Sequence, residues 1–230
     1  MPTRVLIIDD HPLMREALSL ALLMPAGEFD VETAPTLQAG TARMREQAFD
    51  VVMLDLGLPG CTGIDALHAA RKVESDAAIA VVSSTNDPRT IVACLRDGAD
   101  GFIPKTASRE VMIHALRLIV DGGTFVPPEA IGSLGALAAE PAGAPAVRRS
   151  DAPGAVDPRQ LGLTERQIDV LRLILKGLPN KLICRQLQLA EGTVKVHVSA
   201  VLRALGVRSR TQAVVAAGRM GLRPDEWQAA

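Results

Sequence analysis

The sequence is poor in aromatic residues: its 230 residues include no tyrosine, four phenylalanines and one tryptophan. Because 48% of the residues are hydrophobic, the cores have to be built from aliphatic side chains. The three cysteines, Cys61, Cys94 and Cys184, are odd in number and widely spaced, which argues against a disulfide framework and against a zinc site. No apolar run approaches the ~20 residues that span a bilayer, and the first residues lack the apolar core of a secretory signal. We therefore expect a cytoplasmic protein without a membrane anchor.

Charge is almost balanced over the whole chain, with a formal net charge of −1, but it is divided unevenly along the sequence. Residues 1–125 carry 11 lysines and arginines against 17 aspartates and glutamates, a net charge of −6. Residues 159–223 carry 12 basic against 3 acidic residues, a net charge of +9. A positive surplus of this size in one segment indicates that its partner is a polyanion.

From residue 4 to about 120, short apolar runs typical of buried strands alternate with amphipathic stretches of helical period. The predicted strands cover residues 4–9, 29–34, 50–55, 79–83 and 100–103, and the predicted helices cover residues 12–23, 36–47, 63–73, 87–97 and 107–120. Strands and helices that alternate with short connections form right-handed crossovers and a parallel sheet covered on both faces. The pattern predicts a flavodoxin-like, doubly wound (βα)5 domain of the α/β class.

Residues 122–158 are rich in alanine, glycine and proline and have few bulky apolar side chains. Such a segment cannot bury enough surface to offset the entropy lost on ordering, which predicts a flexible linker with one short helix near residues 128–139. The sequence therefore divides into an α/β domain over residues 1–122, a linker over 123–158 and a further domain over 159–230.

This last domain is expected to be a small all-α bundle. Helical periodicity predicts four helices, over residues 164–176, 180–188, 191–204 and 208–220. Thr164 is a suitable N-cap for the first of them, and Gly177, Gly206 and Gly221 are suitable residues to end helices.

Three acidic residues follow or end two of the predicted strands. Asp9 and Asp10 close the first apolar run and Asp55 closes the third. In a doubly wound sheet these two strands are neighbours, and ligands bind outside the carboxyl ends of the strands. Carboxylate oxygens with room for water suit Mg²⁺, and without a cation three clustered acids repel one another. The sequence therefore predicts a Mg²⁺ site at this edge of the sheet.

Two further strand ends carry groups that suit a phosphoryl ligand. Ser83 ends the fourth predicted strand, with Ser84 beside it as an alternative inward hydroxyl, and Lys105 follows the fifth. Mg²⁺ and an ammonium group neutralise phosphoryl oxygens, and an ionised carboxylate such as Asp55 can attack phosphorus. The sequence has no glycine-rich phosphate loop, which disfavours nucleotide binding.

This set of residues resembles the receiver domain of two-component response regulators; the resemblance is carried by Asp9, Asp10, Asp55, Pro59, Gly63, Ser83, Lys105 and the run from Gly98 to Phe102. It implies that Asp55 accepts phosphate from a histidine kinase. It also implies that Asp10, Asp55 and the Gly57 carbonyl hold Mg²⁺, with Asp9 acting through water. Ser83 and Phe102 would form a switch pair, in which the hydroxyl moves toward the phosphate and the ring changes rotamer.

Within the basic segment, residues 178–205 contain two short predicted helices joined by about four residues, which is the spacing of a helix-turn-helix motif. On the second of these helices, Lys195, Val196 and Ser199 share one face. The opposite face carries an apolar stripe of Val194, Val198, Val201 and Leu202. A net charge of +9 in the same segment favours double-stranded DNA as the partner.

The segment from Leu163 to Ala213 resembles the LuxR-type output domain of the NarL/FixJ response regulators. The resemblance implies base contacts by Lys195, Val196 and Ser199, phosphate contacts by Lys181 and Thr193, and homodimer pairing through the last helix, with Thr211, Val214 and Val215. Lysine can donate to guanine, and a valine can contact a thymine methyl group.

Two positions depart from this pattern. Gln167 replaces the usual Glu, which removes a charge that braces the scaffold helix, and Ala190 replaces the usual Ser or Thr cap of the recognition helix. The missing cap costs about 1 kcal/mol of helix stability.

The sequence thus predicts a phosphorylation-controlled transcription regulator that turns over no metabolite. Two alternatives remain. A Mg²⁺-dependent phosphatase with an aspartyl-phosphate would want a second acid two residues beyond the nucleophile, where this chain has Gly57. A receiver that regulates by binding alone would not need Asp55, Ser83 and Lys105 together.

Overall fold

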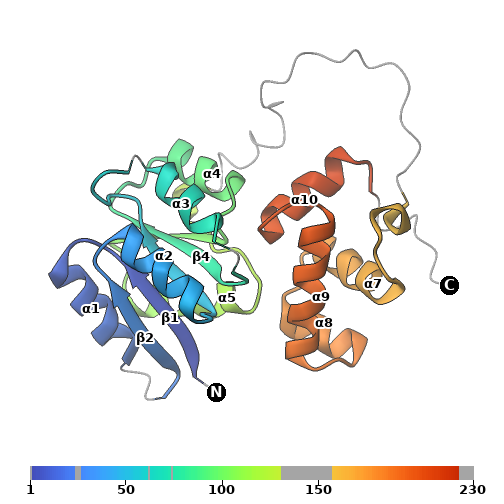
Figure 1. Cartoon of the computed structure of the whole chain (residues 1–230), viewed down its shortest axis with the longest axis horizontal. Helices are drawn as coiled ribbons and strands as arrows, with labels where there is room; N and C mark the ends of the chain where they lie inside the picture. The colour runs from blue at the N-terminus through green and yellow to red at the C-terminus, as the bar shows by residue number, and fades with distance from the viewer. Residues whose placement is uncertain (1, 24–26, 62, 74, 131–156, 223–230) are drawn as a thin grey trace, which may run out of the picture. The chain divides into compact units, whose positions relative to one another are not determined.

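The computed structural model describes residues 2–23, 27–61, 63–73, 75–130 and 157–222. These residues belong to two compact units, which divide between residues 130 and 131 (Figure 1). Each unit has its own hydrophobic core, so each is described separately. Among the described residues, no helix has the length and apolar character needed to cross a membrane.

The first unit alternates strands and helices throughout, as expected. Its strands are β1 (Thr3–Ile8), β2 (Phe29–Ala34), β3 (Val51–Asp55), β4 (Ala78–Ser83) and β5 (Gly101–Pro104), and its helices are α1 (Pro12–Leu23), α2 (Leu37–Glu46), α3 (Ile64–Arg71), α4 (Pro88–Arg96) and α5 (Arg109–Val120). The bounds differ from the predicted ones by no more than two residues at either end, mostly because capping residues such as Thr36, Asp87 and Ser108 stand just outside their helices.

All strand pairs are parallel, and the strand order is β2-β1-β3-β4-β5. The doubly wound α/β fold is therefore confirmed. Ile8 pairs with Leu54 and Asp55 pairs with Val82, so the ends of β1, β3 and β4 meet at one edge of the sheet. This register brings the acidic residues together although they are more than 40 positions apart in the sequence.

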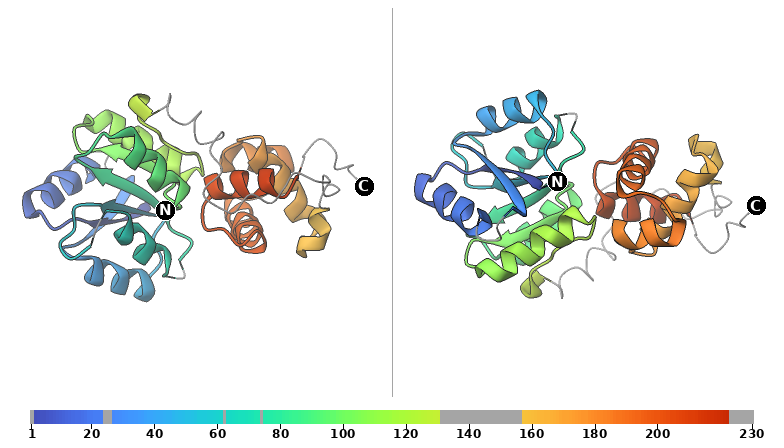
Figure 2. Two further views of the ribbon diagram at one scale, coloured as in Figure 1. Left: turned by 90° about the horizontal axis from the view of Figure 1, so that it is seen from above. Right: turned by 90° about the horizontal axis from the view of Figure 1, so that it is seen from below.

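Helices cover both faces of this sheet (Figure 2). On one face, Leu18 and Leu22 of α1 and Leu116 and Ile119 of α5 pack against alternate residues of the strands. The successive strand residues face opposite sides, so all of β1 from Val5 onward and all of β3 are buried. The described core of this unit is mainly aliphatic, with the phenylalanines Phe29, Phe49 and Phe102 and a few sulfur-containing side chains.

The first unit extends beyond residue 122, where the sequence was expected to enter the linker. Phe125 forms a parallel bridge with Gly101, its carbonyl accepts a hydrogen bond from Phe102 N at 2.9 Å, and its side chain packs against the core. Gly101 allows this approach, because a Cβ there would lie 3.2 Å from the Phe125 carbonyl oxygen and 2.5 Å from Ile119. Residues 128–130 are helical, and the rest of the expected linker up to residue 156 lies outside the described residues.

The second unit is all-helical, as expected. It contains the 3₁₀ helix η1 (Pro158–Leu161) and the helices α7 (Glu165–Leu175), α8 (Asn180–Leu187), α9 (Glu191–Ala204) and α10 (Arg210–Arg219), drawn in yellow to red in Figure 1. Helical periodicity does not predict η1, because its cap Asp157 and first residue Pro158 lie in the proline-rich stretch expected to be linker.

The predicted caps of this unit are present. Thr164 Oγ1 accepts from Gln167 N, and Gln167 Oε1 accepts from Thr164 N at 2.9 Å, so the two residues form a capping box. Gln167 thus retains a bracing role through its amide although it lacks the charge of a glutamate. Gly177, Gly206 and Gly221 have positive φ angles at helix ends, where glycine is favoured.

The turn between α8 and α9 contains Gln188, a non-glycine residue with φ of +54° among the described residues. Leu189 N donates to the Cys184 carbonyl across this turn. Ala190 then begins α9 without a side-chain cap, as expected.

Candidate functional site

The candidate site of the first unit is an acidic pocket at the carboxyl edge of the sheet. Asp9 and Asp55 are 1% and 3% exposed, and Asp10 is half-buried. One ligand atom from each of Asp9, Asp10, His11 and Asp55 lies within 4.8 Å of the others. Two buried, ionised carboxylates this close to a third carboxylate repel one another unless a positive charge lies nearby.

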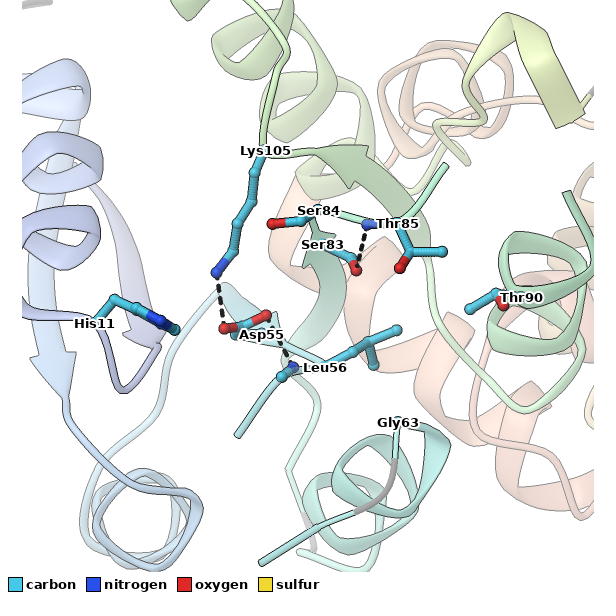
Figure 3. A pocket seen from close by; sticks show the side chains of 10 residues that line it. His11, Asp55, Leu56, Gly63, Ser83, Ser84, Thr85, Thr90 and Lys105 are labelled. Carbon is cyan, nitrogen blue, oxygen red and sulfur yellow. Dashed lines mark hydrogen bonds and ion pairs between the residues drawn. The ribbon is translucent and has the colours of Figure 1, made fainter. Parts of the chain in front are cut away.

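Lys105 supplies that charge in the structure. Its ammonium group donates to Asp55 Oδ2 at 2.7 Å and lies 2.8 Å from Asp9 Oδ2 (Figure 3). Burial alone lowers the pKa of Lys105, but the hydrogen bonds and negative charges of Asp55 and Asp9 outweigh it, so the pKa is raised. The lysine is therefore charged at neutral pH and sits where phosphoryl oxygens on Asp55 would need neutralising.

Hydroxyl groups line the side of the pocket away from the acids. The pocket has a volume of about 300 Å³ and includes Ser83, Ser84, Thr85 and Thr90 in its wall (Figure 3). Ser83 is buried, and its Oγ accepts from Thr85 N at 3.2 Å, whereas Ser84 is exposed. Both candidate serines thus reach the pocket, and Ser83 is the one that is held inside.

The donors present fit a divalent cation that prefers oxygen. Asp10 Oδ1 is buried and, among the described residues, has His11 Nδ1 at 3.0 Å as an ion-pair partner, whereas the buried Asp9 Oδ2 is compensated by Lys105 Nζ at 2.8 Å. Such atoms are costly to bury unless a cation or water satisfies them. Gly57 N donates to Asp55 Oδ1 at 3.0 Å, and a Cβ at residue 57 would come into contact with the Asp55 carboxylate, 3.4 Å from Oδ2.

Phe102, the other member of the expected switch pair, is 0% exposed and stands in β5, beside β4 that ends in Ser83. Its backbone N–H is the group that binds the Phe125 carbonyl. The ring therefore occupies the core, and the backbone of the same residue holds the segment that follows α5.

The candidate site of the second unit is the exposed face of α8 and α9. Val194 and Val201 are fully buried, with Val198 and Leu202 packed beside them, so the predicted apolar stripe anchors α9 in the core. On the other side of α9, Val196 is 66% exposed.

The remaining candidate DNA contacts lie around Val196. Thr193 and Lys181 are exposed, Ser199 is half-buried, and Lys195 Nζ lies 3.7 Å from Glu191 Oε1 one turn earlier. On α10, Val214 and Val215 are 45% and 46% exposed and Thr211 is half-buried, so the residues expected at a dimer interface are accessible in the single chain.

Some residues at these sites were not singled out from the sequence. His11 follows the acid pair and lies 3.0 Å from Asp10, and Thr90 reaches the pocket from α4. Arg210 of α10 donates to Asn180 Oδ1 and to the Leu178 carbonyl, and so braces the start of α8. The adjacency of His11 to the acid pair was a usable signal, whereas the Arg210 contacts depend on tertiary packing.

Comparisons with known proteins agree with this geometry. The family described as "Response regulator receiver domain" matches residues 5–117, and the family "Bacterial regulatory proteins, luxR family" matches residues 161–217. The "Glycerol metabolism activator" of Pseudomonas putida is 34% identical over 217 residues, which cover 94% of this chain and 95% of the relative. The "Nitrate/nitrite response regulator protein NarL" of Escherichia coli (strain K12) is 34% identical over 214 residues, which cover 93% and 94%.

A solved structure, that of the two-component response regulator RcsB in complex with DNA, resembles the chain with a TM-score of 0.53 at 19% identity, over 95% of this chain and 98% of the other. At this identity the likeness supports the fold. The near-complete coverage of the sequence relatives, in the same order of domains, shows the family: the chain belongs to the two-component response regulators that join a receiver domain to a LuxR-type DNA-binding domain and act on transcription.

Proposed function

We propose that Asp55 is the phosphoacceptor and that a sensor histidine kinase is the donor, with Mg²⁺ held by Asp10, Asp55 and the Gly57 carbonyl and by Asp9 through water. The observation that carries this proposal is the placement of the Asp55 carboxylate, which is almost fully buried yet opens into a pocket with Lys105 Nζ at 2.7 Å. A carboxylate that is shielded from bulk water but accessible from a pocket can react with a ligand bound in that pocket.

In the proposed reaction, an oxygen of Asp55 attacks the phosphorus of the phosphohistidine and forms a P–O bond. The P–N bond breaks, its electron pair stays on the imidazole nitrogen, and that nitrogen takes a proton. Bound Mg²⁺ would neutralise oxygens of the transferred group. Lys105, now paired with Asp55 and Asp9, is placed to exchange one carboxylate for a phosphoryl oxygen.

We further propose that the phosphoryl group is read by Ser83 and Phe102. Ser83 Oγ accepts from Thr85 N, and its own O–H can still donate to the phosphate once the two groups approach. Movement of the loop after β4 would then change the space next to Phe102 in β5. The supporting observation is that both residues stand on adjacent, hydrogen-bonded strands.

For the output domain we propose that Lys195, Val196 and Ser199 contact base edges, that Lys181 and Thr193 contact phosphates, and that two copies pair through α10, at Thr211, Val214 and Val215. The exposure of Val196, Val214 and Val215 supports these assignments, because each leaves an apolar side chain in water. As a regulator of chromosomal DNA the protein would act in the cytoplasm. We propose a receiver domain over residues 1–122, to which residues 123–130 are attached in the first unit, an output domain over 159–230, and a linker between the two.

A phosphorylation assay tests the first proposal. The full-length chain is incubated with Mg²⁺ and acetyl phosphate or phosphoramidate, and bound phosphate is located by mass spectrometry. We expect one phosphoryl group on Asp55, none in Asp55→Asn, and an unchanged yield in Asp76→Asn, which removes an exposed acid outside the pocket. If neither small donors nor a kinase modify Asp55, the phosphoacceptor proposal is wrong.

Two lysine variants test the DNA-binding proposal. Lys195→Ala should lower specific binding by about 1–3 kcal/mol and relax the base preference, whereas Lys181→Ala should weaken all sequences together and reduce the salt dependence. Binding would be measured on specific and scrambled duplexes at several salt concentrations. Unchanged binding in both variants would contradict the assignment of α9 as the recognition helix.

A further inference from the structure

His11 stands at the mouth of the acidic pocket, between the acid pair and α1. Its backbone N–H donates to Asp9 Oδ1 at 2.8 Å, and the next residue, Pro12, begins α1. The position of the His11 backbone relative to the acids is therefore fixed on both sides. Figure 3 shows its imidazole directed toward Asp55 across the pocket.

The distance from the His11 ring nitrogen to the Asp10 carboxylate is close to that between two neighbouring ligands of one metal ion. His11 Nδ1 lies 3.0 Å from Asp10 Oδ1 and 3.4 Å from Asp9 Oδ1. Two neighbouring ligands of an octahedral ion, each about 2.1 Å from the metal, are separated by roughly 3.0 Å. A single cation can therefore contact His11 Nδ1 and Asp10 Oδ1 with little movement of either side chain.

A second observation indicates that this space is meant for a ligand. Asp10 Oδ1 is buried and lacks a hydrogen-bond donor within the described ranges, whereas the buried Asp9 Oδ2 already has Lys105 Nζ at 2.8 Å. The His11 side chain itself is 66% exposed, so water can solvate its other ring nitrogen and complete the shell of an ion.

We propose that His11 is an additional protein ligand of the cation site and that it shifts the selectivity of the site toward borderline divalent metals such as Mn²⁺ and Co²⁺. Imidazole nitrogen suits these metals, whereas Mg²⁺ favours oxygen ligands and water. The inference rests on the proposed cation site and concerns which ion occupies it.

Calorimetric titrations of the full-length protein with Mg²⁺, Mn²⁺ and Co²⁺ test this role. We expect His11→Asn to lose at least about tenfold in affinity for Co²⁺ while its affinity for Mg²⁺ changes little, because a side-chain amide oxygen can still serve a hard cation. His114→Asn, which alters an exposed histidine on α5, should leave all three affinities unchanged. Pulsed electron paramagnetic resonance of bound Mn²⁺ should show coupling to an imidazole nitrogen that disappears in His11→Asn.

Equal changes for the three metals in His11→Asn, or a nitrogen coupling that persists in this variant, would overturn the proposal and leave His11 as an ion-pair partner of the acids. Asp10→Asn separates this outcome from failure of the cation site itself. If Asp10→Asn loses all three metals but His11→Asn keeps the selectivity of the unaltered protein, only the role of His11 is wrong. If the unaltered protein binds no Mg²⁺, the proposed Mg²⁺ site is wrong as well.

Discussion

At the scale of single residues, Lys105 decides whether the acidic pocket can exist without a bound ion. Its side chain is 9% exposed and contacts two carboxylates that are themselves 2% and 4% exposed. Removing one partner from a buried ionic group leaves charge without compensation, which is usually far more costly than losing a surface ion pair.

Lys105→Met should therefore lower the free energy of unfolding by roughly 3 kcal/mol in the presence of a chelator. Saturating Mg²⁺ should recover much of this loss, because the ion supplies the missing positive charge. Chemical denaturation with and without Mg²⁺ measures both values. Lys72→Met, which removes an exposed lysine at the end of α3, is the control and should change stability by less than about 0.5 kcal/mol.

The raised pKa of Lys105 also sets a direction for pH dependence. A lysine whose pKa is higher in the folded than in the unfolded state contributes its full stability below the unfolded value of roughly 10.4, and the contribution is lost as the pH rises through the folded value. The stability difference between the unaltered protein and Lys105→Met should thus be constant from neutral pH to about pH 9 and shrink above pH 10.5. A difference that falls between pH 6 and 8 would contradict this assignment.

Residues at strand ends were predictable, while residues that reach the same pocket from helices were not. Asp9, Asp55, Ser83 and Lys105 each follow an apolar run, and parallel strands bring such positions to one edge. Thr90 comes from the first turn of α4, and its contribution depends on the tilt of that helix, which periodicity does not specify.

At the scale of elements, α9 begins without a side-chain cap, as does α8, whose N-cap residue is Pro179. Asp157, Thr164 and Ser209 cap their helices with side-chain oxygens, but Ala190 offers none to the first amides of α9. The uncapped end is the end that carries Thr193 and Lys195.

Ala190→Ser should add up to about 1 kcal/mol to the stability of α9, because the new hydroxyl can accept from an amide of its first turn. Hydrogen exchange of the Gly192 and Thr193 amides measures this locally in the full-length chain, and their exchange should slow. Thr164→Ala provides the opposite case and should speed exchange at the start of α7, where it removes the capping box. If Thr164→Ala has this effect but Ala190→Ser has none, the start of α9 is not limited by its cap.

Most helices and strands were predictable from periodicity, since long amphipathic stretches with flanking caps leave little freedom. The exceptions share a cause. The η1 turn and the Phe125 bridge are too short for a period to identify them and lie in a proline- and glycine-rich region, and the bridge also depends on the distant Gly101. Local sequence carries little information about such elements.

At the scale of the whole molecule, the described residues of the two units bury separate apolar clusters. One is built from the parallel sheet with α1 and α5, and the other from the helices α7 to α10. Their charges also differ in sign. We therefore expect the stability of each unit to depend on its own ligand.

Differential scanning calorimetry should resolve two unfolding transitions in the full-length protein. Mg²⁺ at 100 times its Kd should stabilise one unit by about 2.7 kcal/mol, and a specific DNA duplex should stabilise the other. The variants Asp10→Asn and Lys195→Ala identify which transition belongs to which unit, because each should remove one response. A single transition that shifts with both ligands would show that the two cores unfold together.

The Phe102–Phe125 hydrogen bond makes β5 an anchoring point for the chain as it leaves the first unit. While it holds, residues 123–130 belong to the first unit and the connector begins beyond them. If it breaks, residues 123–130 join the connector and lengthen it by up to roughly 25 Å at about 3.3 Å per residue. The reach of the tether between the two units, and with it their effective concentration for one another, thus depends on one backbone contact of the proposed switch residue.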